Sequence, residues 1–122
     1  MNRFVFLAAL FLAAPAYAQT AYFSALDDLP MPPGFSESAP PGVFEAPEGR
    51  ILALSAEGGG EGLAVRDFYH EALPALGWTE HVRADGALEF RRGRERLSLT
   101  LERAGARWLL GVQVVEVAAP AD

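Results

Sequence analysis

The chain contains no cysteine and no lysine, and it has only two histidines, His70 and His81. Without cysteine it has no disulfide, no thiol nucleophile and no lipid-modified cysteine at the start of an exported chain. Without lysine it has no amine nucleophile. No serine lies in a GxSxG context, and two histidines without cysteine are more typical of a protein surface than of a metal site. We therefore expect a protein that is not an enzyme and that binds no cofactor and no metal.

Long apolar segments are also scarce, and the longest one lies at the N-terminus. Met1-Asn2-Arg3 precedes the apolar run 4–14, and Ala16-Tyr17-Ala18 has the small-x-small pattern that signal peptidase recognises. We expect residues 1–18 to be a cleavable signal peptide and the protein to be periplasmic. The run is short for a bilayer span, which disfavours a retained anchor. No other segment is long and apolar enough to cross a membrane, so we expect no stable membrane span after signal removal. Secretion to the medium and a retained signal anchor in the inner membrane are the alternatives.

Basic residues are few in the rest of the chain. Nine arginines stand against sixteen acidic residues after residue 18, which gives this part a net charge of −7. That balance disfavours nucleic acid and anionic lipid as main partners, because both need a basic surface. The 104 residues after the signal peptide are enough for one small domain. We predict a Pro-rich extended segment at 19–42, a single α+β domain at 43–117 and a tail at 118–122, and the oligomeric state stays open.

Six prolines between residues 30 and 47 exclude long helices and central strands from this segment. Its large side chains, among them Leu29, Met31 and Phe35, are nevertheless too apolar for a purely solvated linker. We expect residues 28–35 to lie extended across the domain, anchored by these side chains. A leader that orders only in part is the alternative.

Residues 63–78 have the pattern of an amphipathic helix. Their apolar residues recur at helical spacing and form one stripe. We expect the regular helix to end near Leu73 because Pro74 lacks an amide, and we expect Gly77 to close it in a left-handed conformation. The apolar stripe consists of Val65, Phe68, Tyr69, Ala72, Leu73 and Leu76.

A glycine-rich run, 58–62, precedes this helix. A glycine-rich turn between a strand and a helix invites a phosphate-binding interpretation. However, no GK[ST] sequence follows, and Leu63 stands where a GxGxxG pattern needs its last glycine. We interpret the run as a surface loop.

Alternating apolar and polar residues predict four strands after the helix, at about 78–84, 87–92, 95–103 and 107–117. Before the helix, residues 43–46 and 50–57 form one extended run with a bend at Pro47, and the strand at 50–57 joins an edge of the sheet. The predicted fold class is α+β. One amphipathic helix packs on a four- to five-stranded, mainly antiparallel sheet in the order β-α-β-β-β-β, preceded by the Pro-rich segment.

Hairpin turns fix the register of the last four strands, because a shift by one residue would move every apolar side chain to the other face. The same face is apolar in all of them. Around a turn at Gly93-Arg94 the predicted pairs are Phe90–Leu97 and Leu88–Leu99. Around a turn at Ala104-Gly105 they are Leu101–Trp108, Leu99–Leu110 and Leu97–Val112, with Glu102 opposite Arg107. Around a bulge at Asp85-Gly86 they are Val82–Phe90, Ala84–Leu88 and Arg83–Glu89.

Two surfaces are candidate binding patches. The basic one surrounds the Gly93 turn and would suit a phosphate, an anionic glycan or an acidic partner, although nearby glutamates offer a charge-paired hairpin as the alternative. The apolar one lies on the sheet face opposite the helix, where either the Pro-rich segment covers it or it binds something. The basic patch is Arg91, Arg92, Arg94 and Arg96, and the apolar patch is Leu109, Val115 and Val117.

The helix and its flanks resemble an uncharacterised family of small exported bacterial proteins that carry an FYxxxLPxLGW signature. Residues 68–78 read FYHEALPALGW. Residues 46–50 before them, the strand end at 90–92 and the Pro-rich lead-in at 29–34 are also similar. The resemblance implies an exported protein but assigns no catalytic residue, and this chain departs from the family where residues 58–62 replace a capped helix start.

Two hypotheses of function follow. The first is a non-enzymatic periplasmic or envelope protein that acts as an interaction or binding module for a protein or another envelope component. The second is a small-ligand carrier with a cleft between the helix and the sheet. The cleft requires that the large side chains Phe68, Leu73, Trp78 and Trp108 leave that space open.

Overall fold

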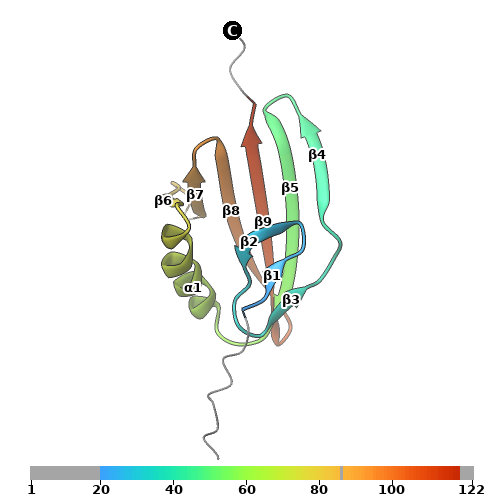
Figure 1. The fold of residues 1–122 in the computed structure, drawn as a ribbon. Helices are drawn as coiled ribbons and strands as arrows, with labels where there is room; N and C mark the ends of the chain where they lie inside the picture. The colour runs from blue at the N-terminus through green and yellow to red at the C-terminus, as the bar shows by residue number, and fades with distance from the viewer. Residues whose placement is uncertain (1–19, 86, 119–122) are drawn as a thin grey trace, which may run out of the picture.

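The computed structural model describes residues 20–85 and 87–118, so the predicted signal peptide and most of the predicted tail lie outside the described residues. Within them, one helix and nine strands form a single α+β arrangement (Figure 1). The elements are β1 (Tyr22–Phe23), β2 (Leu26–Pro30), β3 (Phe35–Glu37), β4 (Gly42–Ala46), β5 (Gly49–Gly58), α1 (Gly62–Ala75), β6 (Thr79–Val82), β7 (Leu88–Arg92), β8 (Glu95–Ala104) and β9 (Arg107–Val117).

The main sheet has seven strands in the order β3-β5-β9-β8-β7-β6, with β4 also paired to β5, and its described pairs are all antiparallel. β1 and β2 form a separate two-stranded sheet. The α+β class, the single helix and the antiparallel sheet are therefore confirmed. The predicted four to five strands and the order β-α-β-β-β-β are wrong. The Pro-rich segment forms β1, β2 and β3, and the residues that follow it form β4 as a separate strand.

The stretch 42–58 is a hairpin and not one bent strand. Ala46 lies opposite Gly49, so Pro47 and Glu48 are a two-residue turn. β5 is consequently an inner strand, with β9 on one side and β3 and β4 on the other, where we predicted an edge strand. Gly49 has φ +141°, and a Cβ there would lie 1.9 Å from the carbonyl oxygen of Glu116. A side chain at this position would push β9 away, so the close approach of the two strands requires glycine.

The register of the β7–β8 hairpin is confirmed, with Phe90 opposite Leu97 and Leu88 opposite Leu99. The β8–β9 register is shifted by two residues from the prediction: Ala104 lies opposite Arg107, and the turn is Gly105-Ala106. In both hairpins a glycine with positive φ, Gly93 or Gly105, occupies the first turn position, which alanine fills poorly. A shift of two residues keeps every side chain on its predicted face, so the predicted apolar face is right. The partners differ, because Leu101 lies opposite Leu110 and Glu102 lies opposite Leu109.

The predicted bulge between β6 and β7 is wrong. Val82 lies opposite Leu88, and His81 lies opposite Glu89, in a regular ladder. The extra residues form a longer connection in place of the bulge, in which the Ala87 amide donates to a carboxylate oxygen of Asp85. The predicted turn residue Gly86 itself lies outside the described residues.

Helix α1 continues two residues past Leu73, because Pro74 lacks only its own amide in the last turn. Gly77 closes it with φ +92°, as predicted. The amides of Gly77 and Trp78 donate to the carbonyls of Pro74 and Leu73, and this pair of bonds is a Schellman motif. The chain therefore leaves the helix in a fixed direction and enters β6.

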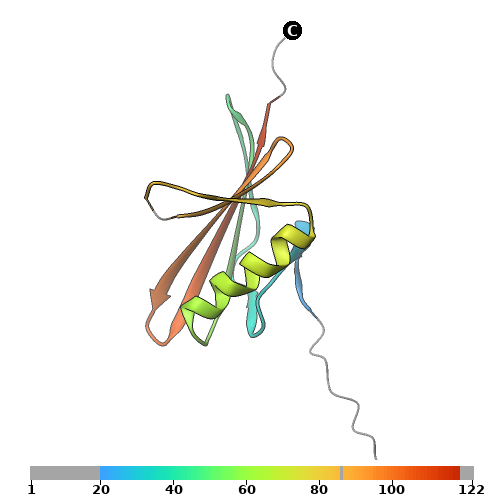
Figure 2. The same ribbon diagram turned by 90° about the vertical axis from the view of Figure 1, so that its left-hand side faces the viewer.

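Helix α1 and the β1–β2 hairpin lie on the same side of the twisted main sheet (Figures 1 and 2). Phe23, Leu29, Met31 and Phe35 are buried together with the helix stripe and the facing sheet residues. The prediction that the Pro-rich segment is anchored by its large side chains is thus confirmed. The segment covers the helix side of the sheet, which we call the inner face, and the other side is the outer face.

The buried phenol of Tyr69 connects the helix to this segment. Its hydroxyl donates a hydrogen bond of 2.8 Å to the carbonyl oxygen of Pro30. Tyr69 has no measurable exposure, and this burial raises the pKa of its hydroxyl well above the ordinary value of 10.0.

Replacing Tyr69 with Phe should therefore lower the free energy of unfolding by about 1–3 kcal/mol, because the buried Pro30 carbonyl loses its donor. Urea unfolding measures the change. Tyr22→Phe is the matched control, since Tyr22 is 51% exposed, and it should stay within about 0.5 kcal/mol of the unchanged protein. Equal effects of the two substitutions would contradict the role of this bond.

Tyr69 also makes stability depend on alkaline pH. Because its pKa is raised in the folded state, its contribution is complete below the ordinary pKa of 10.0 and is lost as pH rises above it. The free energy of unfolding should fall by up to about 1.4 kcal/mol per pH unit above that point. Urea unfolding between about pH 9 and about pH 11 should show a weaker pH slope for Tyr69→Phe. The same slope in both proteins would contradict this assignment.

Candidate functional site

The outer face of the main sheet carries one continuous row of side chains across five strands. Phe44 on β4 lies opposite Ile51 on β5, which lies opposite Val115 on β9. Val115 in turn lies opposite Arg96 on β8, which lies opposite Arg91 on β7. We call these five residues the outer row. Its apolar half ends in Phe44, which is 57% exposed at the sheet edge.

The predicted apolar patch is divided by the structure. Val115 belongs to the outer row, and Val117 lies two residues further on the same face, opposite Gly49. Leu109 is 37% exposed but lies toward the other end of β9, opposite Glu57 and Glu102. Val115 and Val117 therefore share a surface from which Leu109 is separate.

The four arginines of the predicted basic patch are also divided. Arg91 and Arg96 lie on the outer face, exposed, and Arg91 has the Glu89 carboxylate at 3.5 Å. Arg94 is the second residue of the β7–β8 turn, and its carbonyl accepts from the Val117 amide. Arg92 points to the inner face. The structure thus places two of the four beside the apolar row.

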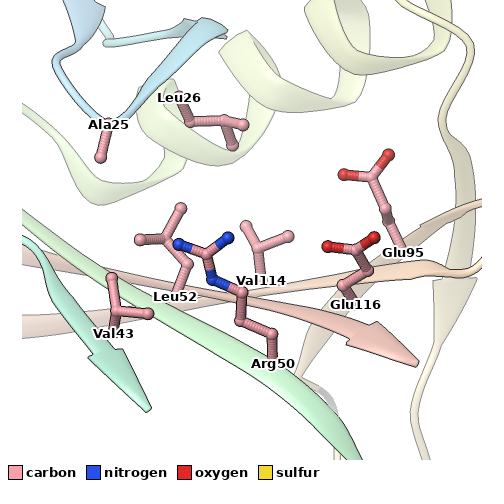
Figure 3. A pocket seen from close by; sticks show the side chains of 8 residues that line it. All are labelled: Ala25, Leu26, Val43, Arg50, Leu52, Glu95, Val114 and Glu116. Atoms are coloured by element: carbon pink, nitrogen blue, oxygen red, sulfur yellow. The ribbon is translucent and has the colours of Figure 1, made fainter. Parts of the chain in front are cut away.

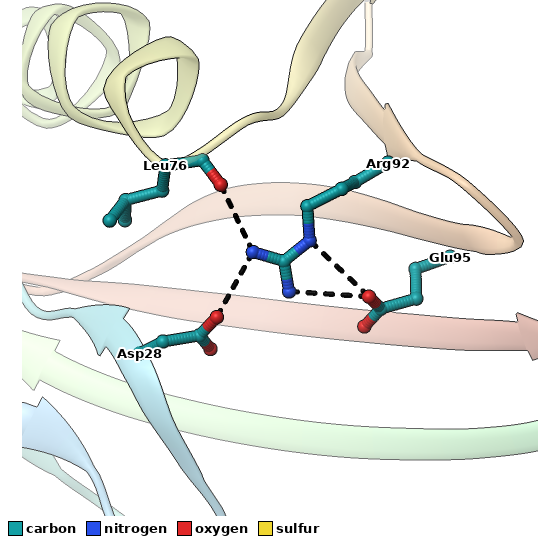
Figure 4. Close-up of polar contacts among 4 residues, drawn as sticks. All are labelled: Asp28, Leu76, Arg92 and Glu95. Atoms are coloured by element: carbon teal, nitrogen blue, oxygen red, sulfur yellow. Dashed lines mark hydrogen bonds and ion pairs between the residues drawn. The ribbon is translucent and has the colours of Figure 1, made fainter.

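Arg92 contacts four other residues, and Figure 4 shows its polar contacts with three of them, Asp28, Leu76 and Glu95. Its Nη1 donates to Asp28 Oδ2 at 3.0 Å and to the Leu76 carbonyl oxygen at 3.1 Å. Its Nε and Nη2 both donate to Glu95 Oε1, at 3.3 and 3.2 Å. The guanidinium also lies 4.3 Å from the ring centroid of Trp78, a cation–π distance. These donors are already used, so we leave Arg92 out of the candidate binding surface.

Sequence reasoning missed Phe44 and Ile51. Both lie in the stretch that we predicted to be one bent strand, which gave no partner for either residue. The signal was present, because Ile51 and Ala53 alternate with Leu52 and Leu54. A two-residue turn at Pro47-Glu48 would have placed Phe44 opposite Ile51.

The predicted cleft between helix and sheet is filled by side chains. Leu73 and Trp78 are buried, and Phe68 and Trp108 are half-buried against the same core. The indole nitrogen of Trp108 donates to the Gly60 carbonyl oxygen at 2.9 Å, which fixes the glycine-rich loop to β9.

A groove of about 250 Å³ lies elsewhere on the inner face, between the tip of the β1–β2 hairpin and the sheet (Figure 3). Sequence reasoning did not find it, because its wall comes from the hairpin that we predicted to be a simple extended segment. Its lining is Ala25, Leu26, Val43, Arg50, Leu52, Glu95, Val114 and Glu116.

The two histidines have different surroundings. His70 Nδ1 lies 2.5 Å from Glu80 Oε2 and joins α1 to β6 at the protein surface. His81 is exposed on the outer side of β6. Among residues 20–85 and 87–118, no three His, Asp or Glu side chains are grouped as metal ligands would be.

No family model matches this chain, and no curated protein or solved structure matches it significantly. The resemblance to the FYxxxLPxLGW family therefore stays a prediction. In the described part of the chain, no helix has the length and apolar character that a membrane crossing needs. The described residues form a small α+β protein in which an open sheet face and the groove beside the β1–β2 hairpin are the two candidate binding surfaces.

Replacing Arg92 with Gln should lower the free energy of unfolding by about 1–3 kcal/mol, because Asp28, Glu95 and the Leu76 carbonyl lose a charged donor that is 27% exposed. Arg96→Gln makes the same change on the exposed outer face and should cost at most about 0.5 kcal/mol. Urea unfolding of the two variants measures both changes in the free energy of unfolding. An Arg96→Gln effect as large as that of Arg92→Gln would contradict the structural role of the Arg92 contacts.

Proposed function

We propose that this chain is an exported, non-enzymatic binding module of the bacterial envelope, which docks a segment of another envelope protein on its outer sheet face. The observation that carries the proposal is the outer row, in which the apolar side chains of Phe44, Ile51 and Val115 continue directly into Arg96 and Arg91. Export is the expectation from residues 1–18, and it sets the compartment of the partner.

The composition of the row supports a protein partner. Interface centres are enriched in aromatic residues and arginine and are depleted in lysine and acidic residues. Here an exposed Phe at the sheet edge and two exposed arginines flank two aliphatic side chains. Of the acidic residues on this face, Glu57 and Glu102 lie toward the other end, and the buried Glu89 lies 3.5 Å from Arg91. The partner segment should therefore present an apolar anchor followed by carboxylates.

Carboxylates on the partner segment would direct it to the outer row and away from the rest of the surface. The chain as a whole is acidic, so an acidic partner would be repelled at most other places on its surface. Charge complementarity at Arg91 and Arg96 then selects the orientation of the docked segment more than it adds affinity.

A small-ligand carrier is the alternative function. The middle of the space between α1 and the sheet is occupied by Leu73 and Trp78, so this part offers no room for a ligand. The inner groove beside the β1–β2 hairpin is the observation that favours this alternative.

A photo-crosslinking amino acid at Phe44 in the full chain, expressed in bacterial cells, tests the docking proposal. We expect a discrete adduct with one envelope protein. The same group at Glu102, on the outer face near Leu109, is the matched control and should give no such adduct.

Charge reversal at the basic end of the outer row is the second part of the crosslinking test. In the variant Arg91→Glu with Arg96→Glu, the adduct at position 44 should decrease roughly tenfold, the effect of about 1.4 kcal/mol. Equal adducts at positions 44 and 102, or an adduct that the two reversals leave unchanged, would overturn the proposal.

A further inference from the structure

The inner groove has walls that are held in place before any ligand arrives. The turn of the β1–β2 hairpin is Ser24-Ala25, and Ala25 and Leu26 lie over the sheet. Ser24 donates from its amide and its hydroxyl to the Glu37 carboxylate. On the other side of the tip, Asp28 accepts from Arg92 at 3.0 Å. Because both flanks of the tip are bonded to the body of the protein, the groove is preorganised.

The centre of the groove is apolar and the groups around it are charged. Leu26, Leu52 and Val114 line the part between the hairpin and the sheet, and Val43 lines the side at the edge strand β4. Figure 3 shows the Arg50 guanidinium in the groove and the carboxylates of Glu95 and Glu116 together on one side of it. A ligand here would meet an apolar surface, one cation and a pair of anions.

The charged groups are incompletely matched with one another. Glu45, Arg50, Glu116 and Glu95 lie opposite one another in turn across four strands. Among the described residues, no carboxylate lies within 4.0 Å of the Arg50 guanidinium. Glu116 lies directly opposite Glu95, and like charges in this position destabilise a sheet.

Glu95 and Glu116 differ in what already binds them. Oε1 of Glu95 accepts two hydrogen bonds from Arg92, at 3.3 and 3.2 Å. Glu116 has no such bond among the described residues and is exposed. A cation placed at Glu116 would therefore relieve the repulsion between the two carboxylates.

We infer that this groove binds a small zwitterion with an apolar side chain, of the α-amino acid type. Its carboxylate pairs with Arg50, its ammonium group pairs with Glu116 beside Glu95, and its side chain lies against Leu26, Leu52 and Val114. A simple anion would meet three carboxylates around one arginine, and a simple amine would leave Arg50 without a partner. Only a ligand with both charges complements both ends of the groove.

Calorimetric titration of the full mature chain with L-leucine tests the inference, with two leucine derivatives as comparisons. N-acetyl-leucine lacks the ammonium group, and leucinamide lacks the carboxylate. We expect leucine to bind. Each derivative should bind at least roughly tenfold more weakly than leucine, because a charge-assisted hydrogen bond is lost.

Two substitutions assign the charges. Arg50→Gln should abolish the preference for leucine over leucinamide, and Glu116→Gln should abolish the preference for leucine over N-acetyl-leucine. Arg107→Gln and Glu57→Gln are matched controls, because this pair, joined at 2.9 Å, lies at the far end of the sheet. The controls should keep both preferences.

Absence of any heat with leucine at millimolar concentration would overturn the inference, as would equal binding of all three compounds. Unchanged preferences in Arg50→Gln and Glu116→Gln would also overturn it, since Arg50 and Glu116 would then be solvated surface charges. The site is separate from the outer row, so its failure leaves the docking proposal unaffected.

Discussion

The contacts of the Arg92 guanidinium are those on which the packing of the helix, the sheet and the N-terminal segment depends most. The guanidinium joins the N-terminal segment through Asp28, the end of the helix through the Leu76 carbonyl, and β8 through Glu95 (Figure 4). It also lies over the ring of Trp78, 4.3 Å from the centroid. The Leu76 carbonyl is among the last in the helix and has no partner within it, so a cation there also complements the helix dipole. With the Tyr69 bond to Pro30, these contacts hold the Pro-rich segment against the inner face.

This placement explains why the two faces of the sheet differ. The inner face receives both α1 and the β1–β2 hairpin, and its apolar side chains beneath them are buried or half-buried. The groove remains between the tip of the hairpin and the end of the sheet that carries Arg50 and Glu116. The outer face receives neither element, so its apolar and basic residues form a surface. Both candidate sites are consequences of where one proline-rich segment lies.

The elements after residue 62 were predictable from the sequence, because local patterns determine them. Helical spacing gave the stripe of α1, and strict alternation gave the apolar face of β7, β8 and β9. The β8–β9 register was wrong by two residues, since alternation alone does not distinguish even shifts; the preference of Gly105 for the first turn position does. The elements before residue 62 were less predictable. The interpretation of Pro47 as a bend leaves out β4 as a separate strand, and with it Phe44 and Ile51. The groove is missed for another reason, because the β1–β2 hairpin that forms its wall is predicted as a simple extended segment.

The most direct test of this account is the reactivity of single cysteines introduced along β9, which the cysteine-free chain makes possible. Thiol labelling of the folded protein should be fast for Gln113→Cys and Val115→Cys on the outer face. It should be slow for Val112→Cys and Val114→Cys, whose positions are buried on the inner face. Protection at 113 and 115 would mean that the N-terminal segment covers the outer face, and it would contradict the central claim that this face is open for binding.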